Sequence, residues 1–278
     1  FVLDDEVGRY IPEISEMKVL AGMDGDRPIL VPQARPVTIR HLMTHTSGMT
    51  YGFFSESNYG ESLWAQSGVL DVGRPLAEMP RILKNLPLLF QPGERWLYSV
   101  AIDVIGLLIE VISGETLDVF LRERLFEPLG MKDTGSWTRP ENKDRLATLY
   151  SLAPGGMLVP IEAPGGPFDA PRAFLSGGGG LVSTMRDYWR FAQMLANGGV
   201  LDGVRVLGPR TVRLMGSNHL PAHIRNYGDP PHAGHDFGLG VRVMRNPAEA
   251  GELGSPGNFG WSGLASTDYW VDPITKVV

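Results

Sequence analysis

Apolar side chains recur at helical spacing in two stretches of the chain. Residues 100–113 place their apolar positions on one face, and Gly114 follows directly as a C-terminal cap. Residues 185–196 repeat this pattern after Thr184, and Thr184 and Asp187 have the spacing of a capping box. The pattern therefore predicts two amphipathic helices, one near the middle of the chain and one in its second half.

Shorter patterns predict the elements around these helices. We expect short helices over residues 2–11, 39–43, 75–85 and 117–126, where apolar spacing coincides with flanking Thr, Gly or Pro residues. A loop is expected over residues 23–36, and loop with short elements over residues 131–176. An irregular aromatic-rich segment is expected before residue 75. Four consecutive glycines, Gly177 to Gly180, indicate a close backbone approach or a sharp bend.

The period changes in the last quarter of the chain. Short β-rich stretches separated by Gly, Asn and Asp-Pro turns predict strands over residues 237–243, 259–264, 269–271 and 275–278. Helices in the middle of the chain and strands at its end predict an α+β fold with an antiparallel sheet, rather than alternating βαβ units.

Length, charge and composition exclude several classes of protein. With 278 residues, of which 43% are hydrophobic, the chain can bury a sizeable core, which excludes global disorder. A net charge of -6 without a basic face makes nucleic acid an unsuitable partner. The longest apolar run, residues 104–109, is far shorter than the ~20 residues of a membrane helix. The chain is therefore expected to be soluble, and its lack of cysteine leaves the compartment open, with the cytoplasm slightly favoured.

Two histidines resemble a metal site without completing one. His41 and His45 lie one helical turn apart, as two zinc ligands would, but Leu42 stands where a metalloprotease needs its glutamate base. We therefore expect His45 to bond instead to backbone at the turn formed by residues 46–48.

Other familiar motifs are also incomplete. His232 and His235 are interpreted as loop histidines rather than metal ligands. Residues 260–264 read Gly-Trp-Ser-Gly-Leu and lack the last glycine of a nucleophile elbow. The glycine run at residues 177–180 does not have the spacing of a dinucleotide-binding loop.

One Ser-x-x-Lys sequence occurs, at Ser15 to Lys18. In principle, a lysine one turn after a serine can activate the hydroxyl as a nucleophile. Such a serine needs a buried helix behind it to fix the geometry, whereas Lys18 is followed closely by a polar loop. We interpret this match as a coincidence.

Three stretches taken together resemble a known family. They are residues 41–48 (His-Leu-Met-Thr-His-Thr-Ser-Gly), residues 96–100 (Trp-Leu-Tyr-Ser-Val) and residues 259–263 (Phe-Gly-Trp-Ser-Gly). Their order and spacing are similar to those of the serine β-lactamase-like superfamily, most of all to the family VIII carboxylesterases, over essentially the whole chain. The resemblance implies a β-lactamase and penicillin-binding-protein-like fold.

The resemblance also implies roles for particular residues. Tyr98 matches the tyrosine that helps to move the proton of the attacking serine, a task for which a free phenol needs a cationic partner at neutral pH. Trp261, Ser262 and Gly263 match the Trp-x-Gly element that replaces the Lys-Thr-Gly of β-lactamases. The backbone N–H of Leu264 would then contribute to the oxyanion hole. An indole in place of a lysine removes a fixed charge and suits a neutral ester.

In the family that the chain resembles, the Ser-x-x-Lys nucleophile lies upstream of the segment that corresponds to residues 1–14. We therefore expect the nucleophile outside this sequence. We also expect further residues after the C-terminal end. The expected organisation is an incomplete α/β part, residues 1–30 and 181–278, and a mainly helical part, residues 31–180.

The function expected from this resemblance is that of a serine carboxylesterase cleaving short-acyl esters through an acyl-enzyme, without a metal or organic cofactor. The expected partner is a small-molecule ester, not nucleic acid or a membrane, and the oligomeric state is open. The alternatives are a non-catalytic binding relative, or an amidase, peptidase or acyltransferase of the same fold.

Overall fold

The fold was analysed in a computed structural model that describes residues 2–54, 58–163, 166–225, 227–228 and 231–278. Its helical elements are η1 (Val7–Arg9), α1 (Glu13–Glu16), α2 (Ile39–Met43), α3 (Tyr59–Gln66), η2 (Leu76–Glu78), α4 (Met79–Leu83), α5 (Ala101–Ser113), α6 (Leu117–Leu121), the π-helix η3 (Arg122–Phe126), η4 (Pro140–Arg145), α7 (Met185–Ala196), α8 (Pro209–Met215) and α9 (Pro247–Ala250). The strands are β1 (Val19–Asp24), β2 (Arg27–Val31), β3 (Leu149–Leu152), β4 (Leu158–Ile161), β5 (Val200–Leu201), β6 (Val204–Arg205), β7 (His235–Phe237), β8 (Arg242–Met244), β9 (Phe259–Ser262) and β10 (Asp268–Val271).

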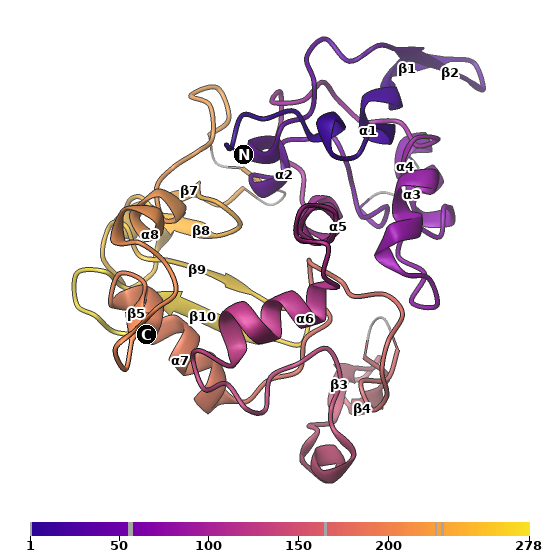
Figure 1. Cartoon of the computed structure of the whole chain (residues 1–278). Coiled ribbons are helices and arrows are strands. Elements are labelled where there is room, and N and C mark those ends of the chain that lie inside the picture. Colours follow the sequence, from indigo (N-terminus) through magenta and orange to yellow (C-terminus); the bar gives the residue numbers. More distant parts are fainter. Residues whose placement is uncertain (1, 55–57, 164–165, 226, 229–230) are drawn as a thin grey trace.

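A four-stranded sheet forms one side of the molecule. Its order is β10-β9-β8-β7, and every neighbouring pair is antiparallel, as the sequence predicted. Helix α7 packs against β10, and the apolar face of α7 contributes Ala192 and Leu195 to the core beneath the sheet. Figure 1 shows the sheet on one side, the N-terminal elements on the other, and α5 between them.

Helix α5 is the centre of the second core. Its buried residues Val104, Leu107 and Leu108 pack among apolar side chains from α1, α2, α3 and α4. Gly114 ends the helix with a left-handed φ of 74°, which confirms the predicted cap. The glycine run packs against this helix, because a Cβ on Gly177 would overlap the carbonyl oxygen of Ile102. This close approach explains the sequence signal.

The N-terminal region differs from the prediction. Residues 2–11 contain only the short turn η1, because Val7 N–H donates to Val37 O and Glu6 bridges Thr38, so this backbone pairs with the chain before α2 rather than with itself. The predicted loop at residues 23–36 is largely the hairpin β1–β2, whose turn contains Gly25 at a φ of 58°. The residues that indicated a loop make the turn of a hairpin.

A helix also replaces part of the expected irregular segment. Asn58 caps α3 by accepting from Gly60 N–H and Glu61 N–H, and Trp64 on this helix is fully buried and donates its indole N–H to Pro87 O. Helix α3 therefore forms through its cap and tertiary burial rather than through a long apolar period.

Two predicted strands were wrong in detail. Residues 237–243 form two strands, β7 and β8, because the intervening chain turns at Gly240 with a φ of 73°. Residues 275–278 are not a strand, since the Asp272 carboxylate accepts from Ile274 N–H and Thr275 N–H and turns the chain. The α+β class is nevertheless confirmed, whereas the division into parts 1–30 with 181–278 and 31–180 stays a prediction.

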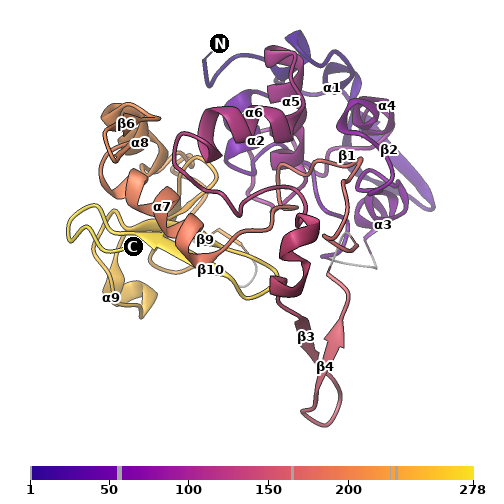
Figure 2. The same ribbon diagram turned by 60° about the horizontal axis from the view of Figure 1, so that its bottom comes forward.

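Two further features complete the fold. The hairpin β3–β4 projects from the body of the molecule in both views (Figures 1 and 2). Within the described ranges, none of the helices is both long enough and apolar enough to traverse a membrane.

Candidate active site

Tyr98 lies directly before α5, at the junction of the helices and the sheet. Its ring contacts four other aromatic rings, with centroid distances of 4.8 Å to His45, 5.1 Å to Tyr51, 5.6 Å to Trp261 and 6.3 Å to Trp96. The phenol is half-buried in this cluster. The structure therefore brings together Tyr98 and Trp261, which the sequence analysis assigned to one site.

Trp261 reaches this cluster from β9. The strand register places it opposite Tyr269, and its ring lies edge-on to Phe237 of β7 at 5.3 Å. Gly260 beside it carries no side chain because a Cβ there would overlap the Tyr269 carbonyl oxygen. The indole is thus held by the sheet on one side and by Tyr98 on the other.

The turn after β9 contains Leu264, whose backbone N–H the resemblance assigned to an oxyanion hole. Gly263 N–H donates to Thr267 O at 2.7 Å, while Leu264 N–H makes no hydrogen bond to another described residue. The Leu264 side chain is 82% exposed and Ser262 is also exposed. A Cβ on Gly263 would overlap the Thr267 hydroxyl oxygen, so the Thr267 side chain packs closely against this glycine.

Tyr51 is a member of the cluster that the sequence analysis missed. Burial raises the pKa of its phenol, and the nearby Asp103 carboxyl and Tyr98 raise it further. The Tyr51 hydroxyl lies beside Gly178, where a Cβ would approach it within 2.6 Å. The only sequence signal was its place just after the His-Thr-Ser-Gly motif, in a segment that appeared merely aromatic.

The buried Asp103 of α5 and the half-buried Ser176 form a hydrogen-bonded pair near Tyr51. Ser176 Oγ donates to Asp103 Oδ1 at 2.5 Å, and Gly178 N–H donates to the same oxygen at 3.2 Å. Burial raises the pKa of the Asp103 carboxyl, and these hydrogen bonds oppose the rise. The pair ties the glycine run to α5 and so fixes the wall of the site behind Tyr51.

The histidines of the first motif have different positions from those expected. His41 caps α2, where its Nδ1 accepts from Thr38 N–H, and burial lowers the pKa of its imidazole to about 4. The sequence analysis expected the His45 side chain to bond to backbone at the turn formed by residues 46–48, and this expectation was wrong. Its Nδ1 lies 3.2 Å from Ser99 Oγ, next to Tyr98.

The other dismissed candidates lie elsewhere. Helix α1 ends at Glu16, so Ser15 and Lys18 do not share a helical turn, and both are exposed. Both views place α1 well away from β9 (Figures 1 and 2). His235 lies at the start of β7 rather than in a loop. In the part of the chain that is described, no group of three or more His, Asp and Glu side chains could hold a metal ion.

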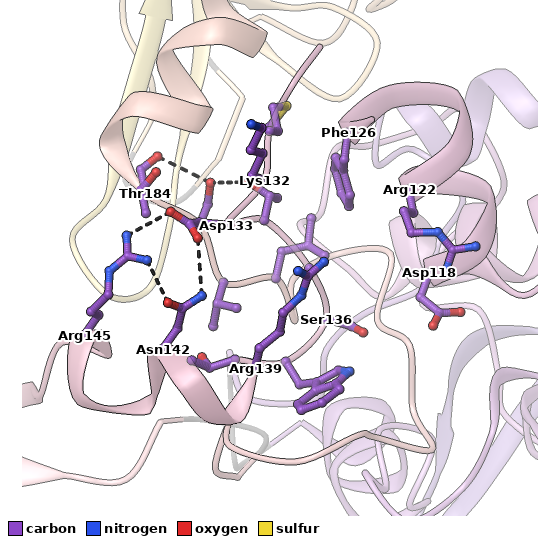
Figure 3. A pocket seen from close by; sticks show the side chains of 18 of the residues that line it. Asp118, Arg122, Phe126, Lys132, Asp133, Ser136, Arg139, Asn142, Arg145 and Thr184 are labelled. Atoms are coloured by element: carbon purple, nitrogen blue, oxygen red, sulfur yellow. Dashed lines mark hydrogen bonds and ion pairs between the residues drawn. The ribbon is translucent and has the colours of Figure 1, made fainter. Parts of the chain in front are cut away.

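A separate cavity of about 590 Å³ lies between η3, η4 and the start of α7 (Figure 3). It contains none of the residues that the sequence analysis assigned to the site. Arg145 in its wall is held by Asp133 at 2.8 Å and by Asn142 at 2.9 Å. Asp187 of α7 accepts from Asp133 N–H at 2.7 Å, so its carboxylate secures this wall instead of completing the predicted capping box. This part of the cavity wall is therefore held by one ion pair and the hydrogen bonds around it.

A family model described as Beta-lactamase matches residues 1–278, a range that includes the α2 motif, Tyr98 and the Trp261 strand. The chain belongs to the β-lactamase family. The predicted β-lactamase and penicillin-binding-protein-like fold is thereby confirmed.

Proteins similar to this chain include one without a described activity, an esterase and a hydrolase of known structure. Protein Rv1367c of Mycobacterium tuberculosis is 36% identical over 99% of this chain and 69% of its own length. The lovastatin esterase of Penicillium rubens is 33% identical over 78% of this chain and 53% of its own length. The structure of EstCE1, described as a hydrolase with promiscuous acyltransferase activity, superposes with a TM-score of 0.78 at 29% identity, covering 99% of this chain and 71% of that one.

Proposed function

We propose that this protein is a serine carboxylesterase that cleaves neutral short-acyl esters through an acyl-enzyme. The observation that carries the proposal is the contact between Tyr98, just before α5, and Trp261, on β9. Tyr98 supplies a phenol for proton transfer and Trp261 supplies an apolar wall. In the turn that follows Trp261, the Leu264 N–H bonds to no other residue that the structure describes.

Tyr98 is the group that moves the proton in this proposal. The serine oxygen attacks the acyl carbon while its proton passes to the Tyr98 oxygen, with the motif lysine as cationic partner. The tetrahedral oxyanion accepts hydrogen bonds from the serine N–H and from Leu264 N–H. When the ester C–O bond breaks, Tyr98 returns the proton to the leaving alcohol, and water then repeats the sequence to release the acid.

Trp261 sets the preferred substrate charge. A β-lactam carries a carboxylate, which needs a cationic or hydrogen-bonding partner when it loses water. The rings of Trp261, Trp96 and Phe237 adjoin one another and offer no charge. A neutral ester loses less hydration energy against this surface and is the favoured substrate.

The attacking serine is assigned by this proposal to a Ser-x-x-Lys element of the full-length gene product other than Ser15 to Lys18. Ser15 lies on a short surface helix without a lysine on the same turn. Acyl transfer to an alcohol is a second candidate, since the apolar rings around Tyr98 would favour an apolar acceptor over water, and EstCE1 is described as having such an activity.

A fluorophosphonate label tests the proposal directly. The full-length gene product is assayed with a short-chain nitrophenyl ester, labelled, digested and mapped by mass spectrometry, with Ser15→Ala as the matched control. We expect ester hydrolysis, loss of activity on labelling, and a label in a Ser-x-x-Lys sequence in both proteins. A label on Ser15 would overturn the assignment of the nucleophile. Absence of both hydrolysis and labelling would favour the non-catalytic binding relative.

A further inference from the structure

His45 is connected to the chain on both sides of Tyr98. Its carbonyl oxygen accepts from Leu97 N–H at 2.9 Å, and its Nδ1 lies 3.2 Å from the hydroxyl of Ser99. One residue therefore holds the residue before Tyr98 through its backbone and the residue after it through its side chain.

The imidazole of His45 also contacts the Tyr98 ring itself. The two rings are 4.8 Å apart at an angle of 61°, and Trp96 and Phe237 pack edge-on against the same imidazole at 5.8 and 5.7 Å. His45 is 2% exposed, so it reaches no solvent. We infer that His45 is a positioning residue that fixes the orientation of the Tyr98 phenol for proton transfer; this inference rests on the proposed function.

The hydrogen bonds around Ser99 fix how His45 acts. Ser99 Oγ accepts from Ala101 N–H at 3.4 Å, which leaves its own hydrogen free to point at His45 Nδ1. Burial lowers the pKa of His45 to about 3, so the imidazole is neutral at physiological pH. Nδ1 accepts and the ring hydrogen is assigned to Nε2. The neutral imidazole therefore acts through its packing against Tyr98 and its hydrogen bond with Ser99, and it places no charge beside the site.

The backbone of His45 is consistent with this role. Its φ of 53° places a non-glycine residue in the left-handed region, which costs on the order of 1 kcal/mol and persists where surrounding contacts impose it. Glycine or asparagine would adopt this conformation at lower cost, but glycine would make no bond to Ser99 and neither would place a ring against Tyr98.

The test combines His45 variants with Tyr98→Phe in the full-length gene product. His45→Leu fills the space without the bond, His45→Asn restores a polar atom near the position of Nδ1 and tolerates the backbone, and Ser99→Ala removes the partner alone. A displacement of about 1 Å at a reacting group can cost ~10²-fold in rate. We expect His45→Leu to lower kcat by about 10-fold or more with little change in KM, and His45→Asn to recover part of that loss.

The decisive readout is the effect of His45→Leu in the Tyr98→Phe background. If His45 acts through the Tyr98 hydroxyl, the second substitution adds no further loss of kcat. An equal loss in both backgrounds would mean that His45 only stabilises the fold and would overturn the inference. If His45→Leu does not fold, Ser99→Ala takes its place in the double-mutant cycle. No further loss of kcat in the Tyr98→Phe background would then support the inference, and an equal loss in both backgrounds would overturn it.

A second measurement needs no catalysis. Fluorine NMR of meta-fluorotyrosine at position 98 in the 278-residue chain should give one resonance, which splits, broadens or shifts in His45→Leu and less so in His45→Asn. An unchanged resonance in His45→Leu would contradict the inference. Failure of the proposed function is distinguishable, because Tyr98→Phe by itself would then leave turnover unchanged whatever His45 does.

Discussion

Replacing Trp261 by lysine should shift the substrate preference of the full-length gene product from neutral esters towards carboxylate-bearing β-lactams. The indole lies beside Tyr98 on β9, and the substitution puts an ammonium group where a substrate carboxylate would approach. We expect the ratio of kcat/KM for the neutral ester to that for the lactam to fall. In the unmodified enzyme, we expect that ratio to exceed one.

The magnitude follows from the exposure of the site. Two unit charges about 5 Å apart attract by about 3 kcal/mol at an effective dielectric constant of ~20. Because Trp261 is only half-buried, solvent screening reduces this to about 1 kcal/mol, or roughly a five-fold change in the ratio. The substitution also removes the ring pairs with Tyr98 and Phe237, each about 0.5–1.5 kcal/mol, so the free energy of unfolding should fall by about 1–3 kcal/mol.

Trp270→Lys provides the matched control. Trp270 stands opposite Gly260 in the register and therefore points to the other face of the sheet from Trp261, and it is 49% exposed. The Trp270→Lys substitution therefore introduces the same charge into the adjoining strand, on the face of the sheet away from Tyr98. Steady-state kinetics for a nitrophenyl ester and a β-lactam are measured for all three proteins at several salt concentrations, since an effect carried by charge weakens as salt increases.

Three results would refute the reasoning. If the unmodified enzyme prefers the anionic lactam, Trp261 does not set the substrate charge. If Trp261→Lys leaves the ratio untouched, or changes it no more than Trp270→Lys does, the effect is not local to the site. A change that does not diminish with salt would be a packing effect rather than an electrostatic one.

Three further predictions follow from the same geometry. Tyr98→Phe in the full-length gene product should lower acylation by about 10²- to 10⁴-fold with an unchanged melting curve, with Tyr150→Phe on the projecting hairpin as control; near-normal turnover would make Tyr98 only a packing residue. The 278-residue chain by itself should show no robust ester turnover, and Ser15→Ala should not change this; activity lost on that substitution would identify Ser15 as a nucleophile. Burial lowers the pKa of His45 from its ordinary value of 6.5 to about 3, so the free energy of unfolding should decrease as the pH falls from 6.5 towards 3. Urea titrations at several pH values should show a shallower decrease for His45→Asn. An identical pH dependence in the two proteins would contradict a neutral buried imidazole.

The sequence predicted most reliably the elements whose signal is local. Helices α5 and α7 carry an apolar period and a cap within a few residues of their ends, and these signals do not depend on the rest of the fold. The same holds for the turn-separated strands β9 and β10. Tyr98 and Trp261 could be assigned to one site in advance because their motifs resemble a family, not because periodicity places them together.

Only the tertiary structure determined the features that depend on distant partners. Residues 2–11 pair with the chain before α2, and α3 forms by burying Trp64, so neither could be identified from local spacing. Tyr51 enters the site because the glycine run lets the chain approach α5 closely, and His45 reaches Ser99 rather than its own turn because α2 packs against α5. These contacts depend on which surfaces pack against each other in the core, and that packing cannot be predicted from a short segment of sequence.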